Sequence, residues 1–213
     1  MTYQSKHTKI YDAKTWYDKV WDQYRNYHDH LNSFDKWYFL NLLPKDTSNL
    51  DIIDLWAWDG RLYKLFESRW YKFNSYTAID ISPKLLKNHP DQVNKIIWNL
   101  EDDLTFENES FDFAFSFFVF EHLSDLNNLF SETERILRTW WQFIIWHFIQ
   151  RREFLRKSDP NKNWVQSENF KIQFFNHRLQ DIEKVAKKNL LSFHAIPMTE
   201  KGHIIWHIII CNK

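Results

Sequence analysis

The stretch DIIDLWAWDGRLYKLF, residues 51–66, decides how this chain folds. Its first five residues predict a buried strand, and GRLYKLF predicts the start of an amphipathic helix. Between the two lies a tight turn, WAWDG, at residues 56–60. Turns of this kind usually contain glycine, because glycine alone takes a positive φ without penalty and lets a ligand approach the backbone. Two tryptophans in this turn are therefore unexpected.

Composition narrows the possible classes of protein. A chain of 213 residues suits one α/β domain with a sizeable core. Its 28 basic and 28 acidic residues balance, which does not favour a generic nucleic-acid or anionic-membrane binder. A single cysteine, Cys211, excludes an internal disulfide and a multi-cysteine metal site, and we predict no metal site. Without an apolar N-terminal run or an apolar stretch near the ~20 residues of a membrane helix, we expect a cytoplasmic protein.

Glycine and tryptophan have abnormal frequencies. Average usage of ~7% would give roughly 15 glycines in a chain of this length. The chain has 2 glycines and 12 tryptophans, and several of these tryptophans stand at turns and strand entrances. We hypothesise that many of them occupy glycine positions, because the codon UGA means tryptophan in some genetic codes and glycine in a few bacterial lineages. The coding DNA decides the matter, and TGG at codons 56 and 58 would refute the hypothesis.

Short apolar runs alternate with amphipathic segments after Pro44, which is typical of a parallel sheet flanked by helices. Lys201 and Gly202 predict a hairpin turn, so the last strand should run antiparallel. We expect a single folding unit with an N-terminal helical cap at 1–50, an α/β domain at 51–213, and a long substrate or lid loop at 151–175. The expected strands are 52–57, 76–81, 95–97, 111–117, 142–148, 191–196 and 204–211, and the expected helices are 11–43, 60–68, 83–87, 124–138 and 178–189.

With glycine at positions 56 and 58 the turn becomes DLGAGDG, which resembles motif I of class I S-adenosylmethionine-dependent methyltransferases. Residues 96–145, IIWNLEDDLTFENESFDFAFSFFVFEHLSDLNNLFSETERILRTWWQFII, resemble the type-11 methyltransferase pattern. That pattern has an acidic loop, FD at the start of the fourth strand, EHL, a helix with E..R.L, and a glycine pair before the fifth strand. In this chain Trp98, Trp140 and Trp141 stand where the pattern has glycine, and Asn99 stands where it usually has aspartate.

The resemblance implies a Rossmann-like class I methyltransferase fold: a mostly parallel seven-stranded sheet with an antiparallel last strand and helices on both faces. It also implies S-adenosylmethionine as the cofactor and transfer of its methyl group to an O, N, C or S atom of an acceptor. Asp80 ends a strand 20 residues beyond Gly60, a spacing that suits a ribose-binding carboxylate; the alternative is that it caps the following helix. The implied cofactor-binding residues are Asp54, Trp56, Trp58, Gly60, Asp80, Ile81, Asn99, Leu100, Glu101, Ser116 and Phe117.

Taken literally, the two tryptophans of the turn conflict with cofactor binding. Each brings roughly 150–250 Å² of side chain into the place that the cofactor needs. Both would also stand where a positive φ is required, which is a strained choice for a bulky residue. We therefore predict that the chain as written binds S-adenosylmethionine poorly or not at all.

His122, in the FEHL stretch, is the nearest candidate for a catalytic base, since histidine titrates near neutrality. The alternative is that it caps the following helix or packs structurally. Neutral charge favours a small-molecule acceptor over RNA, and the sequence leaves the acceptor and the oligomeric state open. Three other functions compete: a degenerate methyltransferase fold that only binds a partner, a nicotinamide-dependent Rossmann oxidoreductase, and a module whose tryptophans stack on carbohydrate or nucleic acid.

Overall fold

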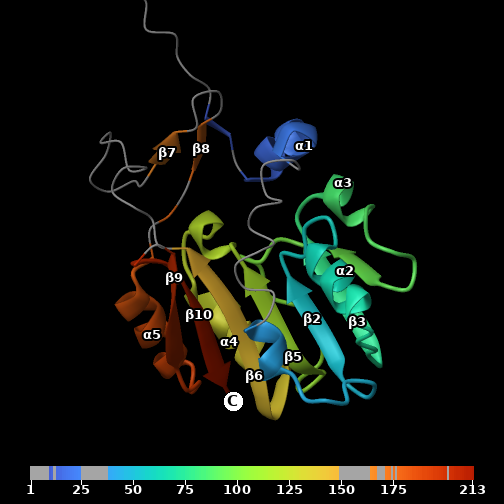
Figure 1. Cartoon of the computed structure of the whole chain (residues 1–213). Helices are drawn as coiled ribbons and strands as arrows, with labels where there is room; N and C mark the ends of the chain where they lie inside the picture. Colours follow the sequence, from blue (N-terminus) through green and yellow to red (C-terminus); the bar gives the residue numbers. More distant parts are fainter. Residues whose placement is uncertain are drawn as a thin grey trace, which may run out of the picture.

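A computed structural model describes residues 10–11, 13–24, 38–148, 164–166, 171–173, 175, 177–200 and 202–213. Its main feature is a seven-stranded sheet in the order β4-β3-β2-β5-β6-β10-β9 (Figure 1). The strands of this sheet are β2 (Asp51–Leu55), β3 (Ser75–Asp80), β4 (Asn94–Ile97), β5 (Phe111–Phe117), β6 (Leu137–Phe148), β9 (His194–Glu200) and β10 (His203–Asn212). The helices are α1 (Ala13–Tyr24), η3 (Phe39–Leu42), α2 (Arg61–Ser68), α3 (Pro83–Leu86), η4 (Phe120–His122), α4 (Asn127–Ile136) and α5 (Leu179–Lys188).

The direction of the strands agrees with the sequence-based prediction. Strands β4, β3, β2, β5 and β6 are parallel, whereas β10 lies antiparallel between β6 and β9. Gly202, with φ +79°, lies in the turn between β9 and β10, where a positive φ suits glycine. The mostly parallel seven-stranded sheet with an antiparallel last strand is confirmed.

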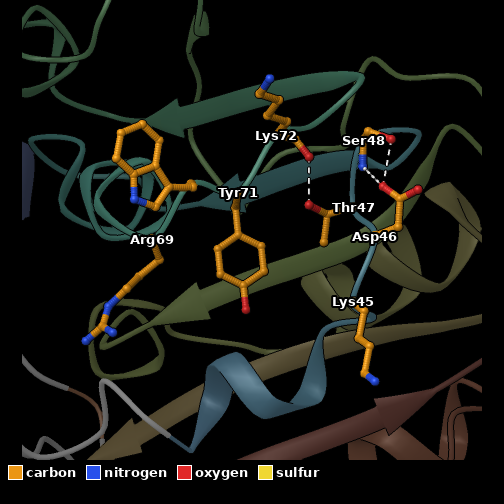
Figure 2. A pocket seen from close by; sticks show the side chains of 8 residues that line it. Lys45, Asp46, Thr47, Ser48, Arg69, Tyr71 and Lys72 are labelled. Carbon is orange, nitrogen blue, oxygen red and sulfur yellow. Dashed lines mark hydrogen bonds between the residues drawn. The ribbon is translucent and has the colours of Figure 1, made fainter.

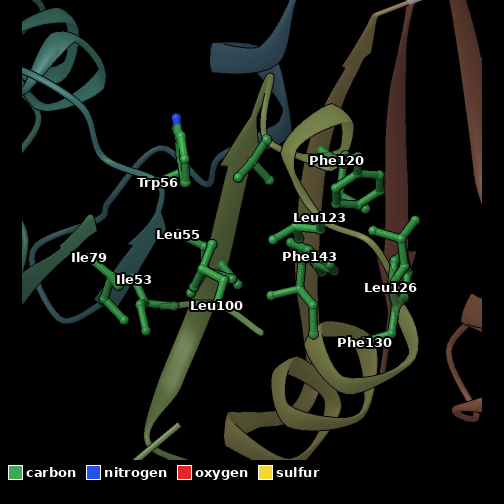
Figure 3. Close-up of a cluster of buried hydrophobic side chains, with 14 of the residues drawn as sticks. Ile53, Leu55, Trp56, Ile79, Leu100, Phe120, Leu123, Leu126, Phe130 and Phe143 are labelled. Carbon is green, nitrogen blue, oxygen red and sulfur yellow. The ribbon is translucent and has the colours of Figure 1, made fainter. Parts of the chain in front are cut away.

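The sheet is buried on both faces because apolar residues occupy consecutive positions in its central strands. Ile53, Ala114 and Ile145 pack on one face with residues of α4 and α5, while Ile52 and Ile144 pack on the other with α2 and η3. Helices therefore cover both faces, as predicted (Figure 1). Figure 3 shows the cluster on the α4 face, which continues to the ends of β2 and β3.

A second, three-stranded sheet lies at one end of the main sheet. Strand β1 (Ile10–Tyr11) pairs in parallel with β8 (Lys171–Gln173), which pairs antiparallel with β7 (Trp164–Gln166). The sequence predicted a loop over 151–175 and a helix from residue 11, so these short strands were missed. Strands this short carry no periodic pattern of their own, and residues far apart in the chain pair to form them.

Helix α1 lies near α3, on the same side of the molecule as β7 and β8 (Figure 1). The Ser82 hydroxyl donates a hydrogen bond to the Asp18 carboxylate of α1. Ser82 is also the N-cap of α3, with Pro83 at the first helical position. The predicted helix over 11–43 consists, in the described residues, of α1 and the short 3-10 helix η3. Residues 25–37 lie outside the described part.

Several predicted boundaries are wrong, among them those of β9, which runs His194–Glu200 instead of 191–196. Helix α4 begins at Asn127, because the Asp125 carboxylate accepts the Asn127 N–H at 3.0 Å outside the helix. It ends at Ile136, and Leu137 already pairs with Phe111 in the sheet, so β6 starts before the predicted residue 142. Among the described residues, no helix has both the length and the apolar character needed to cross a bilayer.

Candidate cofactor site at the carboxyl edge of the sheet

The turn after β2 folds over the end of β3. Trp56 and Ala57 both donate their N–H groups to the Ile79 carbonyl, at 2.9 and 2.7 Å. The backbone of the turn has positive φ at Trp56 (81°), Trp58 (54°) and Gly60 (82°). An alternation of positive and ordinary φ values is the conformation that glycine permits at least cost. The backbone thus takes the path that the restored DLGAGDG sequence predicts.

The Trp56 indole fills the space at the end of β2. It is only 7% exposed, and it stacks on the His122 imidazole with ring centroids 5.1 Å apart and planes 11° from parallel. The Tyr17 ring of α1 meets it edge-on at 5.6 Å and meets the Trp58 indole at 6.2 Å. In Figure 3 Trp56 stands beyond Leu55 and Ile79, at the end of the apolar cluster. The indole extends the core into the expected crevice.

Gly60 and His89 make a close contact that the sequence did not predict. A Cβ on Gly60 would lie 3.2 Å from the His89 ring, and the φ of +82° disfavours a side chain as well. The His89 Nε2 lies 3.0 Å from the Trp58 carbonyl oxygen, and burial lowers the pKa of this imidazole. The neutral His89 ring therefore stabilises the turn by donating a hydrogen bond to the Trp58 carbonyl.

Asp80 ends β3 where the sequence placed a ribose-binding carboxylate. Its two oxygens accept the backbone N–H groups of Trp58 at 3.0 Å and Ser82 at 2.8 Å. Burial raises the pKa of Asp80 to about 7, in spite of these hydrogen bonds. In the chain as written this carboxylate holds the turn, and both of its oxygens are already bonded to the backbone.

Asp54, the motif I acid, lies inside the sheet. It accepts a hydrogen bond from the Tyr76 hydroxyl at 2.8 Å, and burial raises its pKa to about 7. Tyr76 belongs to the apolar cluster on the α2 face, whereas Leu55 and Trp56 belong to the cluster on the α4 face. Asp54 therefore stabilises neighbouring strands and does not point toward Trp56.

The loop after β4 joins the same edge. Leu100 is buried in the cluster that contains Trp56, and the Asn99 side chain accepts the Glu101 N–H at 3.2 Å. The Glu101 carboxylate accepts both the N–H and the hydroxyl of Ser124, at 2.9 and 2.6 Å. These bonds tie the loop after β4 to the loop after β5. Three of the predicted cofactor-binding residues, Asn99, Leu100 and Glu101, are thus held together at the carboxyl edge.

The end of β5 separates two predicted residues. Ser116 shares the face of Ala114, since side chains alternate along a strand, and its buried hydroxyl has no hydrogen-bond partner. Phe117 faces the other side, where its ring centroid lies 4.6 Å from that of Trp146. Ile81, just past β3, is half-buried against the cluster of Trp56. Ser116 and Ile81 therefore belong with the turn, and Phe117 does not.

His122 lies in η4, within reach of the turn. Its Nε2 is 2.9 Å from the Tyr17 hydroxyl, a contact across 105 residues that the sequence did not predict. Burial lowers the pKa of His122 to about 3, so the ring is neutral at physiological pH. A buried imidazole with so low a pKa is a weak base. The neighbouring Glu121 has its pKa raised to about 7 by burial.

A hollow of about 460 Å³ opens at the opposite edge of the sheet, among segments that precede β2 and β3. Figure 2 shows its wall, where the Thr47 hydroxyl donates to the Lys72 carbonyl at 2.7 Å and the Asp46 carboxylate accepts the Ser48 N–H at 3.0 Å. None of the predicted cofactor-binding residues lines it. The lining residues are Lys45, Asp46, Thr47, Ser48, Arg69, Trp70, Tyr71 and Lys72.

The residues at the carboxyl edge do not fit S-adenosylmethionine in the chain as written. The buried Trp56 indole, packed against His122 and Tyr17, takes up the space beside the turn. Each oxygen of Asp80 accepts one backbone N–H and can still accept a further donor, so the misfit lies with the indole and not with the carboxylate. The buried Ser116 hydroxyl, which has no hydrogen-bond partner, is a feature of this edge that suits a polar ligand.

Comparisons with known proteins agree on the class of fold. No curated protein matches the sequence. An S-adenosylmethionine-dependent methyltransferase of Methanosarcina mazei has a TM-score of 0.63 at 18% identity, over 82% of this chain and 96% of that chain. The complex between the Haloferax volcanii Trm112 methyltransferase activator and a methyltransferase has a TM-score of 0.72 at 13% identity, over 96% of this chain and 99% of that chain. The third structure is the Burkholderia thailandensis 1,6-didemethyltoxoflavin-N1-methyltransferase with 1,6-didemethyltoxoflavin and S-adenosylhomocysteine bound. Its TM-score is 0.60 at 13% identity, over 100% of this chain and 98% of that chain.

A family model describes the central part of the chain. Residues 58–145 match the model of the methyltransferase domain, from the second tryptophan of the turn through β3, β4, β5 and most of β6. The mostly parallel sheet with its antiparallel edge agrees with the fold of the solved structures compared above. Residues 58–145 are therefore similar to the methyltransferase domain family, and the described sheet has the fold of the S-adenosylmethionine-dependent methyltransferases compared above.

Proposed function

We propose that this protein, with glycine in the turn after β2, transfers a methyl group from S-adenosylmethionine to a small-molecule acceptor in the cytoplasm. One observation carries the proposal: the turn after β2, Asp80, the loop after β4 and the Ser116 hydroxyl all converge at the carboxyl edge of the sheet. Ligands of open parallel sheets bind at that edge. S-adenosylmethionine supplies an already activated methyl group, so the protein's task is binding and orientation.

The residues of this chain divide between the two ligands in the proposal. On the cofactor side are the turn, Asp80 and Ile81, Asn99 to Glu101, and Ser116. On the acceptor side are α1 and the segment 151–175. The parallel pairing of β1 with β8 supports this division, because it ties the segment before α1 to the predicted lid loop. His122 is the candidate base once the space beside it is open to an acceptor.

Two observations favour a small acceptor. The balanced charge does not suit a phosphate backbone. The Burkholderia neighbour, which matches over the whole of this chain, was solved with 1,6-didemethyltoxoflavin and S-adenosylhomocysteine. The Haloferax neighbour was solved with an activator protein, so a partner protein belongs among the factors to supply in an assay.

Transfer of a radioactive methyl group tests the proposal. The Trp56→Gly/Trp58→Gly variant is incubated with methyl-labelled S-adenosylmethionine and a cell extract, which is then separated into small molecules, RNA and protein. We expect label in the small-molecule fraction and none with the Trp70→Gly/Trp140→Gly variant, which keeps both indoles of the turn. Label in RNA or protein would contradict the small acceptor, and no label in any fraction would contradict methyl transfer.

A second function has its own supporting observation. If both tryptophans of the turn are genuine, the filled edge around Trp56 suits a methyltransferase fold that only binds a partner. Binding of S-adenosylmethionine by the Trp56→Gly/Trp58→Gly variant separates this possibility from the first one. A fold whose cofactor site has been lost for other reasons would not regain affinity for the cofactor when the two indoles are removed. The antiparallel β10 and the match over residues 58–145 favour either reading over a nicotinamide-dependent oxidoreductase.

A further inference from the structure

Tryptophan dominates the unusual backbone positions of this protein. In the part of the chain that the structure describes, seven residues other than glycine have a positive φ, and four of the seven are tryptophan. A left-handed conformation costs a residue with a side chain roughly 1–2 kcal/mol, and where it occurs it favours asparagine and aspartate. The four residues are Trp56 (81°), Trp58 (54°), Trp70 (65°) and Trp140 (75°).

Trp70 occupies a helix end that glycine normally takes. The N–H of Trp70 donates to the Glu67 carbonyl at 3.0 Å, and the N–H of Tyr71 donates to the Phe66 carbonyl at 3.1 Å. These two bonds are those of a Schellman motif, which places Trp70 at the C′ position, where glycine is preferred. The side chain is 89% exposed and thus gains little from packing.

Trp140 occupies a second exposed position of this kind. Its N–H donates to the Lys213 carbonyl at 3.1 Å, and its side chain is 87% exposed. It lies where the pairing of β5 with β6 shifts register between Phe111 and Phe113. Such irregularities often require a glycine. Trp140 therefore has the backbone of a glycine without the contacts of a core residue.

Not every tryptophan shares this property. Trp98 and Trp141 also stand where the family pattern has glycine, yet neither has a positive φ. The Trp98 N–H donates to the Asp80 carbonyl at 3.1 Å, as in an ordinary strand continuation, and Trp141 packs edge-on against Phe113 with ring centroids 5.2 Å apart. Backbone conformation thus selects four positions from a larger set.

We infer that positions 56, 58, 70 and 140 are glycine in the protein that the cell makes, and that the Trp56 and Trp58 indoles alone close the methyl-donor crevice of the chain as written. The inference rests on the proposed function, because it concerns the same cofactor. Trp56 and Trp58 form one pair and Trp70 and Trp140 another. Both pairs have a positive φ, but their surroundings differ. The first pair packs against Tyr17 at the carboxyl edge, and the second pair is exposed.

Calorimetric titration with S-adenosylhomocysteine tests the inference on three proteins: the chain as written, Trp56→Gly/Trp58→Gly, and the matched control Trp70→Gly/Trp140→Gly. We expect affinity for the turn variant that is at least about 100-fold higher than for the other two, since the ligand no longer has to expel buried aromatic side chains. Sequencing the gene should read TGA at codons 56, 58, 70 and 140.

The possible failures are distinguishable. Equal binding by all three proteins would overturn the inference and leave the proposed function standing. Absence of binding by a turn variant that still unfolds cooperatively would overturn both. Failure of the turn variant, and of Trp56→Gly alone, to fold would also overturn the inference, because glycine at its native positions should not unfold the chain. TGG at codons 56 and 58 would overturn the assignment of glycine there.

Discussion

The two edges of the central sheet treat similar residues differently. At the amino edge Trp70 and Trp140 point into solvent, and the Asp51 carboxylate is bonded to Arg138, Ser75 and Asn74. Burial alone would raise the pKa of Asp51, but these hydrogen bonds and the charge of Arg138 hold it below its usual value. The amino edge is therefore polar, its Asp51 carboxylate has hydrogen-bond partners, and it contains the hollow of Figure 2.

At the carboxyl edge the same kinds of residue are buried. Trp56 packs against two rings, and burial raises the pKa of Asp80 to about 7 with no cation among its main causes. A bulky residue at a glycine position therefore costs only backbone strain at one edge, whereas at the other it also occupies the space of a ligand. The effect of tryptophan at a glycine position therefore depends on whether its side chain is exposed or buried.

The largest expected effect concerns His122. Replacing Trp56 with glycine removes the ring stacked on the imidazole and admits water, so the pKa should rise from about 3 toward its ordinary value near 6.5. NMR titration of the His122 ring protons between pH 5 and 8 measures this change. The chain as written and Trp70→Gly should show a flat curve for His122. A flat curve in Trp56→Gly as well would show that the indole does not keep the site dry.

The ion pairs of Arg138 come next. Its guanidinium bonds to Asp112 at 2.8 Å and to Asp51 at 3.0 Å, and so joins the starts of β2, β5 and β6. Arg138→Ala leaves two partly buried carboxylates without a cation, and we expect a loss of about 2 kcal/mol in the free energy of unfolding in urea. Arg178→Ala, which removes the exposed pair with Asp181, should have no measurable effect. Equal stability of the two variants would mean that the amino edge does not depend on its charges.

Asp54 gives stability a pH dependence. Its pKa of about 7 exceeds the unfolded value of 3.8, so the folded chain binds more protons than the unfolded chain between these values. The contribution of Asp54 is therefore present at low pH and is lost as the pH rises through 7. Relative to the chain as written, Asp54→Asn should gain about 1 to 3 kcal/mol in the free energy of unfolding between pH 5 and pH 8.

The asparagine can still accept the hydrogen bond from Tyr76, so the substitution removes the charge with little change in packing. Asp46→Asn is the control, because hydrogen bonds from Ser48 lower the pKa of this exposed acid and it stays ionised throughout the range. Parallel pH profiles for Asp54→Asn and the chain as written would show that Asp54 is ionised inside the sheet.

The smallest effect separates two neighbours at the amino edge. Trp140→Gly relieves a positive φ at an exposed position and should raise the free energy of unfolding by about 1 kcal/mol. Trp141→Gly loses a half-buried ring that packs on Phe113 and should lower it by about 1 to 2 kcal/mol. Thermal or urea unfolding measures both. A lower free energy of unfolding for Trp140→Gly would contradict the inference that the positive φ of Trp140 strains the backbone.

Much of the site was predictable from local patterns. The strand, the tight turn and the following acid place the turn and Asp80 at one edge of the sheet, and the alternation of strands and helices predicts the parallel sheet. The positions of Tyr17 and His89 were not predictable, because they reach the turn from segments whose own patterns say nothing of that contact. The resemblance implied Phe117 as a cofactor-binding residue, but alternation along β5 turns its side chain to the other face.

By itself the sequence determined a parallel sheet flanked by helices and a tight turn after its first strand, and its resemblance to the type-11 methyltransferase pattern implied the cofactor edge and the conflict of that edge with two tryptophans. Those features depend on residue spacing along a few neighbouring elements, and local backbone preferences suffice to express them. Only the tertiary structure decided which of the tryptophans with a positive φ are buried at the carboxyl edge and which are exposed, because burial arises from contacts with residues distant in the chain, such as Tyr17 and His122.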